Sequence, residues 1–172
     1  MTTSSTAAER LPRVQPATGE DAEHIASLTH QRAPETIPVS ADQVGESIDR
    51  YRVVREAGRV VAAAALHPVG ANRLELRSVA VADGCGGRGL GTHVVGALQD
   101  EALRRRRRLV CVTMSPGFFA RLGFERAPMS LVPPKPERRR WPVEAERVAM
   151  SWHPARDHER NDDARPLLRR SA

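Results

Sequence analysis

The segment Ser78–Leu98, SVAVADGCGGRGLGTHVVGAL, places a glycine-rich loop between an apolar run typical of a strand and an apolar pattern typical of a helix. Five glycines fall within eight residues, at positions 84, 86, 87, 89 and 91. Glycine has no side chain, so backbone N–H groups in such a loop are open to phosphate oxygens. The N-terminus of the following helix adds about half a positive charge. The segment therefore predicts an anion-binding loop.

Two familiar phosphate-binding motifs, the Walker A loop and the dinucleotide-binding motif, do not account well for this loop. The Walker A loop requires Gly-Lys-Ser/Thr, and this loop contains no lysine. The dinucleotide-binding spelling G-x-G-x-x-G matches Gly84–Gly89, but that motif belongs early in a parallel βαβ unit. Here it lies mid-chain, after strands whose connections are too short for crossovers. A flexible turn that merely caps a helix remains an alternative.

The apolar periodicity on both sides of the loop predicts an alternating chain. We expect strands over 13–16, 51–56, 59–66, 73–82, 109–114 and 147–152. We expect four helices. The first is capped by Thr18 with Asp21, and the second is capped by Ser40 and runs to about Arg50. The third runs from Leu90 to about Arg106, and the fourth runs from Pro116 to Leu122. The continuously apolar run 59–66 predicts burial on both faces. This order indicates an α/β, or layered α+β, fold with a mixed, mostly antiparallel sheet flanked by helices.

Composition divides the chain into three segments. Residues 12–153 are long enough for one domain with its own core. Residues 1–11 are rich in Ser, Thr and Ala, and residues 154–172 are dense in charge and poor in large apolar residues. Both ends are predicted to be disordered.

The net charge of +6 comes almost entirely from arginine, much of it in the runs 104–108, 138–140 and 169–170. A basic surface can attract nucleic acid, acidic lipid or a phosphorylated cofactor. Aromatic residues make up only 3% of the chain, so the stacking side chains of single-strand binders are missing. The sequence therefore argues against nucleic-acid binding. For the run 104–108 we favour a solvated helix end that complements the helix dipole.

Cysteine usage and hydropathy bear on metal binding, disulfides and cellular location. Cys85 and Cys111 have neither metal-ligand spacing nor a disulfide framework, and Cys111 is expected to be buried. No metal is expected. No apolar run approaches the ~20 residues of a membrane span, and the first ten residues lack a signal-peptide core. We expect a cytoplasmic protein without membrane contact.

The stretch LELRSVAVADGCGGRGLGTHVVGALQDEA, with FFARLGFERA after it, resembles the GNAT superfamily of acetyl-CoA-dependent N-acetyltransferases. It looks most like the small amino-acid N-acetyltransferases of the N-acetylglutamate synthase type, and Val132-Pro133-Pro134-Lys135 echoes a distal motif of that group. The resemblance implies a GNAT fold and transfer of acetyl from acetyl-CoA to a primary amine of a small molecule, such as an amino acid, by direct attack. A homodimer with a paired or exchanged last strand is a further expectation.

The resemblance also implies which residues bind the cofactor. The superfamily's pyrophosphate motif falls on Gly86, Gly87, Arg88, Gly89, Leu90 and Gly91, followed by Thr92. Gly86 occupies a position that is usually Gln or Arg, and Arg88 is expected to compensate. On the preceding strand, Val79, Ala80 and Val81 are expected to offer main-chain hydrogen bonds to the pantetheine arm. An amide near Val81 would polarise the thioester carbonyl, as in an oxyanion hole.

One catalytic group of the superfamily is missing. The tyrosine that often protonates the leaving thiolate corresponds to Phe119. Catalysis through that tyrosine is therefore excluded, and either solvent protonates the thiolate or it leaves unprotonated.

A base is needed because, with a pKa near ~10, only about one amine in a thousand is neutral at pH 7. Glu75, on the strand that carries the acetyl group in the superfamily, is the first candidate, and an exposed ion pair with Arg77 is the alternative role. His67 is the second candidate because its titration range suits pH 7. Arg77 is a candidate for holding a substrate carboxylate. His93 is expected to face solvent.

Three other functions remain open at this stage. Phe119 and Gly86 depart from the superfamily pattern and would suit a non-catalytic acyl-CoA-binding regulatory module. A protein N-terminal or lysine acetyltransferase would share the same fold and cofactor. A basic nucleic-acid-binding protein is the least supported.

Overall fold

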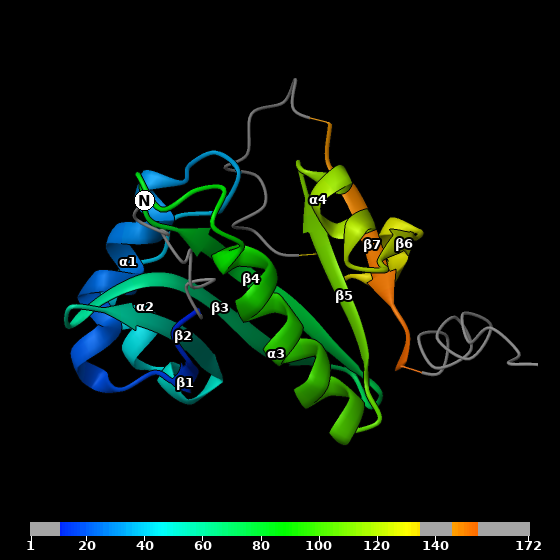
Figure 1. Cartoon of the computed structure of the whole chain (residues 1–172). Helices are drawn as coiled ribbons and strands as arrows, with labels where there is room; N and C mark the ends of the chain where they lie inside the picture. The colour runs from blue at the N-terminus through cyan, green and yellow to red at the C-terminus, as the bar shows by residue number, and fades with distance from the viewer. Residues whose placement is uncertain (1–10, 135–145, 155–172) are drawn as a thin grey trace, which may run out of the picture. The chain divides into compact units, whose positions relative to one another are not determined.

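The computed structural model describes residues 11–134 and 146–154 (Figure 1). Its strands are β1 Val14–Pro16, β2 Tyr51–Glu56, β3 Arg59–Val69, β4 Arg73–Val81, β5 Arg108–Thr113, β6 Glu125–Arg126 and β7 Val148–Trp152. Its α-helices are α1 Ala22–Gln31, α2 Ala41–Gly45, α3 Leu90–Arg104 and α4 Pro116–Arg121, and its 3-10 turns are η1 Gly19–Asp21, η2 Ile48–Arg50 and η3 Met129–Leu131.

The seven described strands follow the hydrogen-bonded order β1-β2-β3-β4-β5-β7-β6. One of the pairings, β4 with β5, is parallel, and the pairings β1–β2, β2–β3, β5–β7 and β6–β7 are antiparallel. The predicted mixed, mostly antiparallel sheet with flanking helices is confirmed.

Two compact units divide the chain. Unit 1 comprises the residues up to 65 together with 78–97, and unit 2 comprises 66–77 together with the residues from 98 onward. The expected disordered ends lie almost wholly outside the described residues, and a single domain over 12–153 stays a prediction.

Unit 1 is built on the β2–β3 hairpin. Val53 and Val54 pair with Ala63 and Ala62, and the hairpin turns at Ala57-Gly58, where both residues have a positive φ. Val60–Leu66 are all buried, which confirms burial of β3 on both faces. The strand runs on to Val69, so His67 lies within it and not at its end.

The helices α1 and α2 cover one face of this hairpin (Figure 1). Ile25, Leu28 and Val44 pack against a core formed by buried side chains of the strands: Tyr51, Val53, Val60, Ala63, Ala65 and Ala80. Ser40 caps α2 as predicted, with the Gln43 N–H donating to its hydroxyl at 3.2 Å. The helix ends at Gly45, short of the predicted Arg50, because glycine at that point favours leaving the helix. A 3-10 turn, η2, completes the connection to β2.

A partly buried ion pair between Arg55 and Asp21 ties β2 to η1, and no local sequence pattern indicates it. Asp21 accepts hydrogen bonds from the Thr18 N–H at 2.7 Å and from Arg55 Nε at 2.9 Å. Burial alone would raise the pKa of the Asp21 carboxyl, but the bonds from Arg55 and Thr18 outweigh burial and hold that pKa below its ordinary value. Thr18 and Asp21 were predicted as a cap, and the structure adds the second role of Asp21.

Unit 2 is organised by β5 and β7. Leu109–Thr113 pair antiparallel with the whole of β7, and Arg73–Glu75 pair in parallel with Arg108–Val110. The helix α4 packs on β7 (Figure 1) and ends before Gly123, whose φ of 81° confirms the predicted left-handed cap. The two-residue strand β6 was not predicted, since two residues carry no periodicity.

Candidate functional site

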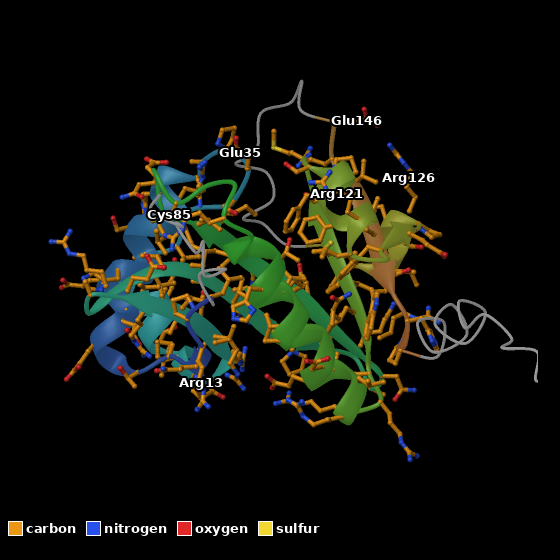
Figure 2. The ribbon with its side chains drawn as sticks, in the orientation of Figure 1. Arg13, Glu35, Cys85, Arg121, Arg126 and Glu146 are labelled. Carbon is orange, nitrogen blue, oxygen red and sulfur yellow. The ribbon has the colours of Figure 1, made fainter. Side chains whose placement is uncertain are left out.

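The glycine loop connects β4 to α3, as predicted, and most of it is exposed. Gly87 and Gly89 have φ angles of 75° and 79°, in the left-handed region that side chains other than glycine avoid. A Cβ built on Gly87 would meet no atom within 4 Å, so the backbone conformation and not crowding demands glycine there. The loop leads directly into the fifteen-residue helix α3, and an exposed glycine loop at a helix N-terminus is an arrangement that suits an anion. Cys85 lies in the same loop (Figure 2).

The N-terminus of α3 is held firmly. Leu90 and Val94 are buried, and the His93 N–H donates to the Gly89 carbonyl at 2.9 Å, which is the first bond of the helix. The expectation that His93 faces solvent is wrong. Its ring is half-buried, and its Nε2 lies 2.9 Å from the Pro12 carbonyl oxygen. The residues ahead of β1, which no local pattern of α3 reveals, cover that position.

Arg88 is already engaged within the protein. Its guanidinium donates to both carboxylate oxygens of Glu56, at 2.7 and 2.9 Å. The hydrogen bonds from Arg88 hold the pKa of the Glu56 carboxyl below its ordinary value, and those to Glu56 raise the pKa of Arg88. The predicted phosphate contact of Arg88 therefore competes with this pair, which ties the loop to the end of β2. Thr92 is exposed at the start of α3.

The end of β4 departs from regular strand geometry. Ser78 has a φ of 52°, unusual for a residue other than glycine and costing roughly 1–3 kcal/mol where it persists. This conformation interrupts the regular alternation of side chains along β4, so the residues before Ser78 and those after it do not follow one two-residue register. Ser78 Oγ lies 3.4 Å from the hydroxyl of Tyr51.

The three strand residues predicted to contact the cofactor lie in this irregular part of β4. The hydroxyl of Thr36 donates to the Val79 carbonyl at 2.8 Å and so holds the segment after α1 against the strand. Ala80 is buried in the core of unit 1, whereas Val79 and Val81 are half-buried. The Ala82 N–H donates to the Val61 carbonyl, so β4 keeps its pairing with β3 up to the loop.

Glu75 lies in unit 2, on the first half of β4. It is only 3% exposed, and Leu74 and Leu76 beside it are equally buried. The alternative role of an exposed surface pair with Arg77 therefore does not describe it. Burial, and next the charge of Glu75, raise the pKa of the Cys111 thiol to about 12, so this thiol stays protonated and inert. Burial of Cys111 was predicted and is confirmed.

Phe119 is part of an aromatic cluster in unit 2. Its ring meets Phe118 and Phe124 edge to face, with centroids 5.0 and 5.4 Å apart, and it is 6% exposed. This position holds no hydroxyl, and its ring is committed to packing. Gln99 of α3 donates to the Leu122 carbonyl at 2.8 Å and fixes the end of α4.

The remaining candidates are spread out. His67 and Arg77 are half-buried, on β3 and β4 of unit 2. Of the run 104–108, Arg104 ends α3 and Arg105 and Arg106 follow it, and all three are exposed, as expected of a solvated helix end. Lys135 and the runs 138–140 and 169–170 lie outside the described residues. Among the described ones there is no group of three His, Cys, Asp or Glu suited to a metal, and no helix has the length and apolarity to cross a membrane.

A model of the acetyltransferase (GNAT) family matches residues 20–124 of this chain. The match covers more than half of the 172 residues and includes β4, the glycine loop, α3 and Phe119.

Solved structures share the fold at low identity. The protein Rv2747 of Mycobacterium tuberculosis, solved in complex with CoA, aligns with a TM-score of 0.70 at 22% identity, over 83% of this chain and 99% of its own. N-acetylglutamate synthase of Neisseria gonorrhoeae, complexed with coenzyme A and N-acetyl-glutamate, gives 0.73 at 19% identity over 84% of this chain, which spans 35% of that enzyme. The ribosomal-protein-alanine N-acetyltransferase of Brucella melitensis gives 0.64 at 19% identity, over 82% and 99% of the two chains.

Proposed function

Because the chain belongs to the acetyltransferase (GNAT) family, we propose that it transfers the acetyl group of acetyl-CoA to the primary amine of a small molecule. Acetyl-CoA is its acyl donor, and the chain is an acyltransferase. The observation that carries the proposal is the bare glycine loop at the start of α3, inside the range that the family model matches.

The loop suits the diphosphate of coenzyme A. Gly86, Gly87, Gly89 and Gly91, with Leu90 and Thr92, would present main-chain N–H groups, and the dipole of α3 would add to the attraction. A direct contact of Arg88 with the diphosphate would require its guanidinium to exchange Glu56 for a phosphate oxygen. The half-buried backbone of Val79 and Val81 would receive the pantetheine arm, with Ala80 between them fixed in the core.

The transfer would proceed by direct attack. The neutral amine nitrogen attacks the thioester carbonyl carbon, the N–C bond forms, the C–S bond breaks, and coenzyme A leaves as a thiolate. The amine gives up one proton to a base. Cys111 is excluded as an acyl carrier because its thiol is buried and its pKa is raised to about 12. An amide N–H near Val81 would stabilise the developing oxyanion.

Glu75 is the proposed base, acting through water. Its side chain is buried on β4, the strand that also carries Val79 and Val81, four and six residues later. A carboxylate within reach of the acceptor amine, directly or through one water, can take up the proton that the amine gives up. Arg77, two residues on, would hold a carboxylate of the acceptor. His67 stays the second candidate for the base.

The departing thiolate receives its proton from somewhere other than Phe119. That ring packs against Phe124 and carries no titratable group. We propose that solvent supplies the proton, as expected for a thiol whose ordinary pKa lies near ~8.5.

A small-molecule acceptor follows from the sequence resemblance and from Arg77. A protein N-terminus is the competing acceptor, since the Brucella melitensis enzyme with this fold is a ribosomal-protein-alanine N-acetyltransferase. The two classes differ in whether a free carboxylate lies next to the reacting amine.

The test is release of coenzyme A thiol from acetyl-CoA, measured against grouped amines: amino acids, polyamines, aminoglycosides and short peptides with free N-termini. We expect turnover with a small amine and at least about a 100-fold lower kcat for Glu75→Gln, within the range for loss of a general base. Arg77→Gln should raise KM for an acidic or amino-acid acceptor more than it lowers kcat.

Binding of acetyl-CoA by calorimetry without thiol release for any group would overturn the proposal in favour of a binding module. Turnover with peptides alone would overturn the small-molecule acceptor while keeping acetyl transfer. Full activity of Glu75→Gln together with loss in His67→Gln would move the base to His67.

A further inference from the structure

A cavity of about 740 Å³ lies in unit 2, and no residue of the glycine loop lines it. Its walls come from the starts of β4 and β5, the end of α3 and the residues after it, the turn η3 and the two residues after β7. This volume falls in the range of about 300–1,000 Å³ typical of small-molecule sites. The cavity is therefore large enough for a ligand of its own.

The lining of this cavity is strongly positive. Arg73, Arg106 and Arg108 line it, together with His153, and no aspartate or glutamate does. Within the described ranges of the chain, none of the three guanidinium groups forms an ion pair with a carboxylate. Three uncompensated charges around one space repel one another unless an anion joins them.

One of the three guanidinium groups is held by a hydrogen bond before any ligand arrives, and the main chain is fixed at the other two arginines. Arg73 Nη1 donates to the Leu131 carbonyl at 2.9 Å, which fixes that side chain across the cavity wall. The Arg108 N–H donates to the Asn72 carbonyl at 3.1 Å, and Arg106 sits in a left-handed conformation with a φ of 52°. Because the Arg73 guanidinium is already held, an anion that binds it loses less side-chain entropy there than it would with a free arginine.

The rest of the lining is apolar. Leu103 and Leu131 are half-buried and contribute carbon surface beside the guanidinium groups. A bare inorganic ion would leave this surface in contact with water. An organic molecule would cover it while its acidic groups meet the arginines.

A neighbouring cavity of about 220 Å³ provides a contrast. It shares Arg108, Leu131 and His153 with the larger one, but Glu125 also lines it. Its charge is therefore mixed and its volume is below the usual range for a ligand site. The larger cavity is the one that selects for negative charge.

We propose that this arginine cavity binds a small organic polyanion, a molecule with at least two carboxylate or phosphate groups on a carbon framework. Arginine recognises both groups through paired N–H bonds, so the two chemistries share one site. The site is separate from acetyl-CoA binding and does not depend on the acetyl transfer proposed above. Two of its arginines come from the run 104–108, whose expected role was only a solvated helix end.

The test is isothermal titration of the full chain, without and with saturating coenzyme A, using citrate and fructose 1,6-bisphosphate as probes. The double variant Arg106→Gln/Arg108→Gln is compared with Arg13→Gln/Arg59→Gln, which removes the same charge from exposed positions outside the cavity (Arg13 is labelled in Figure 2). Binding of either probe is expected, with at least a tenfold loss of affinity in the cavity variant and less than a twofold loss in the control. Citrate binding alone assigns the site to carboxylates, and bisphosphate binding alone assigns it to phosphates.

Three results would overturn the proposal. Neither probe binds the wild type, or both double variants lose affinity equally, which would indicate net charge alone, or coenzyme A abolishes probe binding by occupying the cavity itself. Thermal unfolding and coenzyme A binding of each variant establish that a loss of probe binding is not a loss of fold.

Discussion

The glycine loop and the arginine cavity are two sites suited to anions, built from opposite materials. The loop exposes main-chain N–H groups at the start of α3, and its one arginine is paired with Glu56. The cavity gathers three guanidinium groups without a carboxylate partner among the described residues. One site depends on the absence of side chains, and the other depends entirely on them.

Because of this difference, different kinds of substitution are expected to disrupt the two sites. A main-chain site is lost when the backbone path changes, because the N–H groups move together. A side-chain site is lost one guanidinium at a time and should respond in graded steps. Substitutions can therefore break one site and leave the other intact.

The largest expected effect comes from Gly89→Val. A β-branched side chain cannot adopt a φ of 79° without strain, so the loop and the first turn of α3 shift. We expect coenzyme A affinity to fall about 100-fold, or about 2.7 kcal/mol, by calorimetry, while citrate binding in the cavity is unchanged. The matched control is Gly96→Ala inside α3, where a Cβ meets nothing within 4 Å. Equal coenzyme A affinity in both variants would contradict the loop's assignment.

The next effect is on stability and concerns Asp21→Asn. The change leaves Arg55 without its buried carboxylate, and we expect the free energy of unfolding at pH 7 to fall by about 2 kcal/mol. The folded-state pKa of Asp21 is lowered, so its stabilisation is complete above about pH 4 and is lost as the pH falls through the folded-state pKa.

The contrast is Arg106→Gln/Arg108→Gln, which removes unpaired charges and should change stability by less than about 0.5 kcal/mol. Urea unfolding from pH 7 down to pH 3 measures both effects. A gap between wild type and Asp21→Asn that stays constant into acid would show that the ionised pair is not its cause.

A smaller effect, on citrate affinity, is expected from Arg108→Lys in the arginine cavity. Arg108→Lys keeps the positive charge but loses the planar fork of N–H groups. We expect citrate affinity to fall about three- to fivefold, less than for the double Gln variant. An unchanged affinity in calorimetry would mean that the cavity recognises charge without geometry.

The smallest expected effect concerns Glu56→Gln, which releases Arg88 from its exposed ion pair. A freed guanidinium beside the loop should raise coenzyme A affinity by about twofold at low salt, with the gain lost at high salt. A fall in affinity would show instead that the pair holds the loop in its binding geometry.

Much of the fold was predictable because its signals are local. The four-residue spacing of Leu90, Val94, Leu98 and Ala102 placed α3, and all four side chains are buried. The bounds of β2 were predicted without error, and those of β3 and α2 were missed by three and five residues. Propensity weakens near element ends, where tertiary contacts decide how far pairing continues.

The candidate site was predictable to the same degree. The loop lies where its glycines indicated, and Glu75 is on β4 as expected. The sequence did not predict three features of the site: the contact of His93 with Pro12, the Thr36 hydrogen bond to Val79, and the positive φ of Ser78. The first two join residues that are far apart in the chain, and the third breaks the side-chain alternation of a strand. No short sequence pattern indicates any of the three.

The amino-acid sequence by itself determined the glycine loop, the helix behind it and the family to which they point, because backbone freedom and apolar spacing act over a few neighbouring residues. Only the tertiary structure decided that Asp21 is buried against Arg55 and that Arg73 shares a cavity with Arg106 and Arg108. Such groupings depend on how strands and helices pack across dozens of residues. The charge of a side chain does not indicate which distant residues the fold will bring next to it.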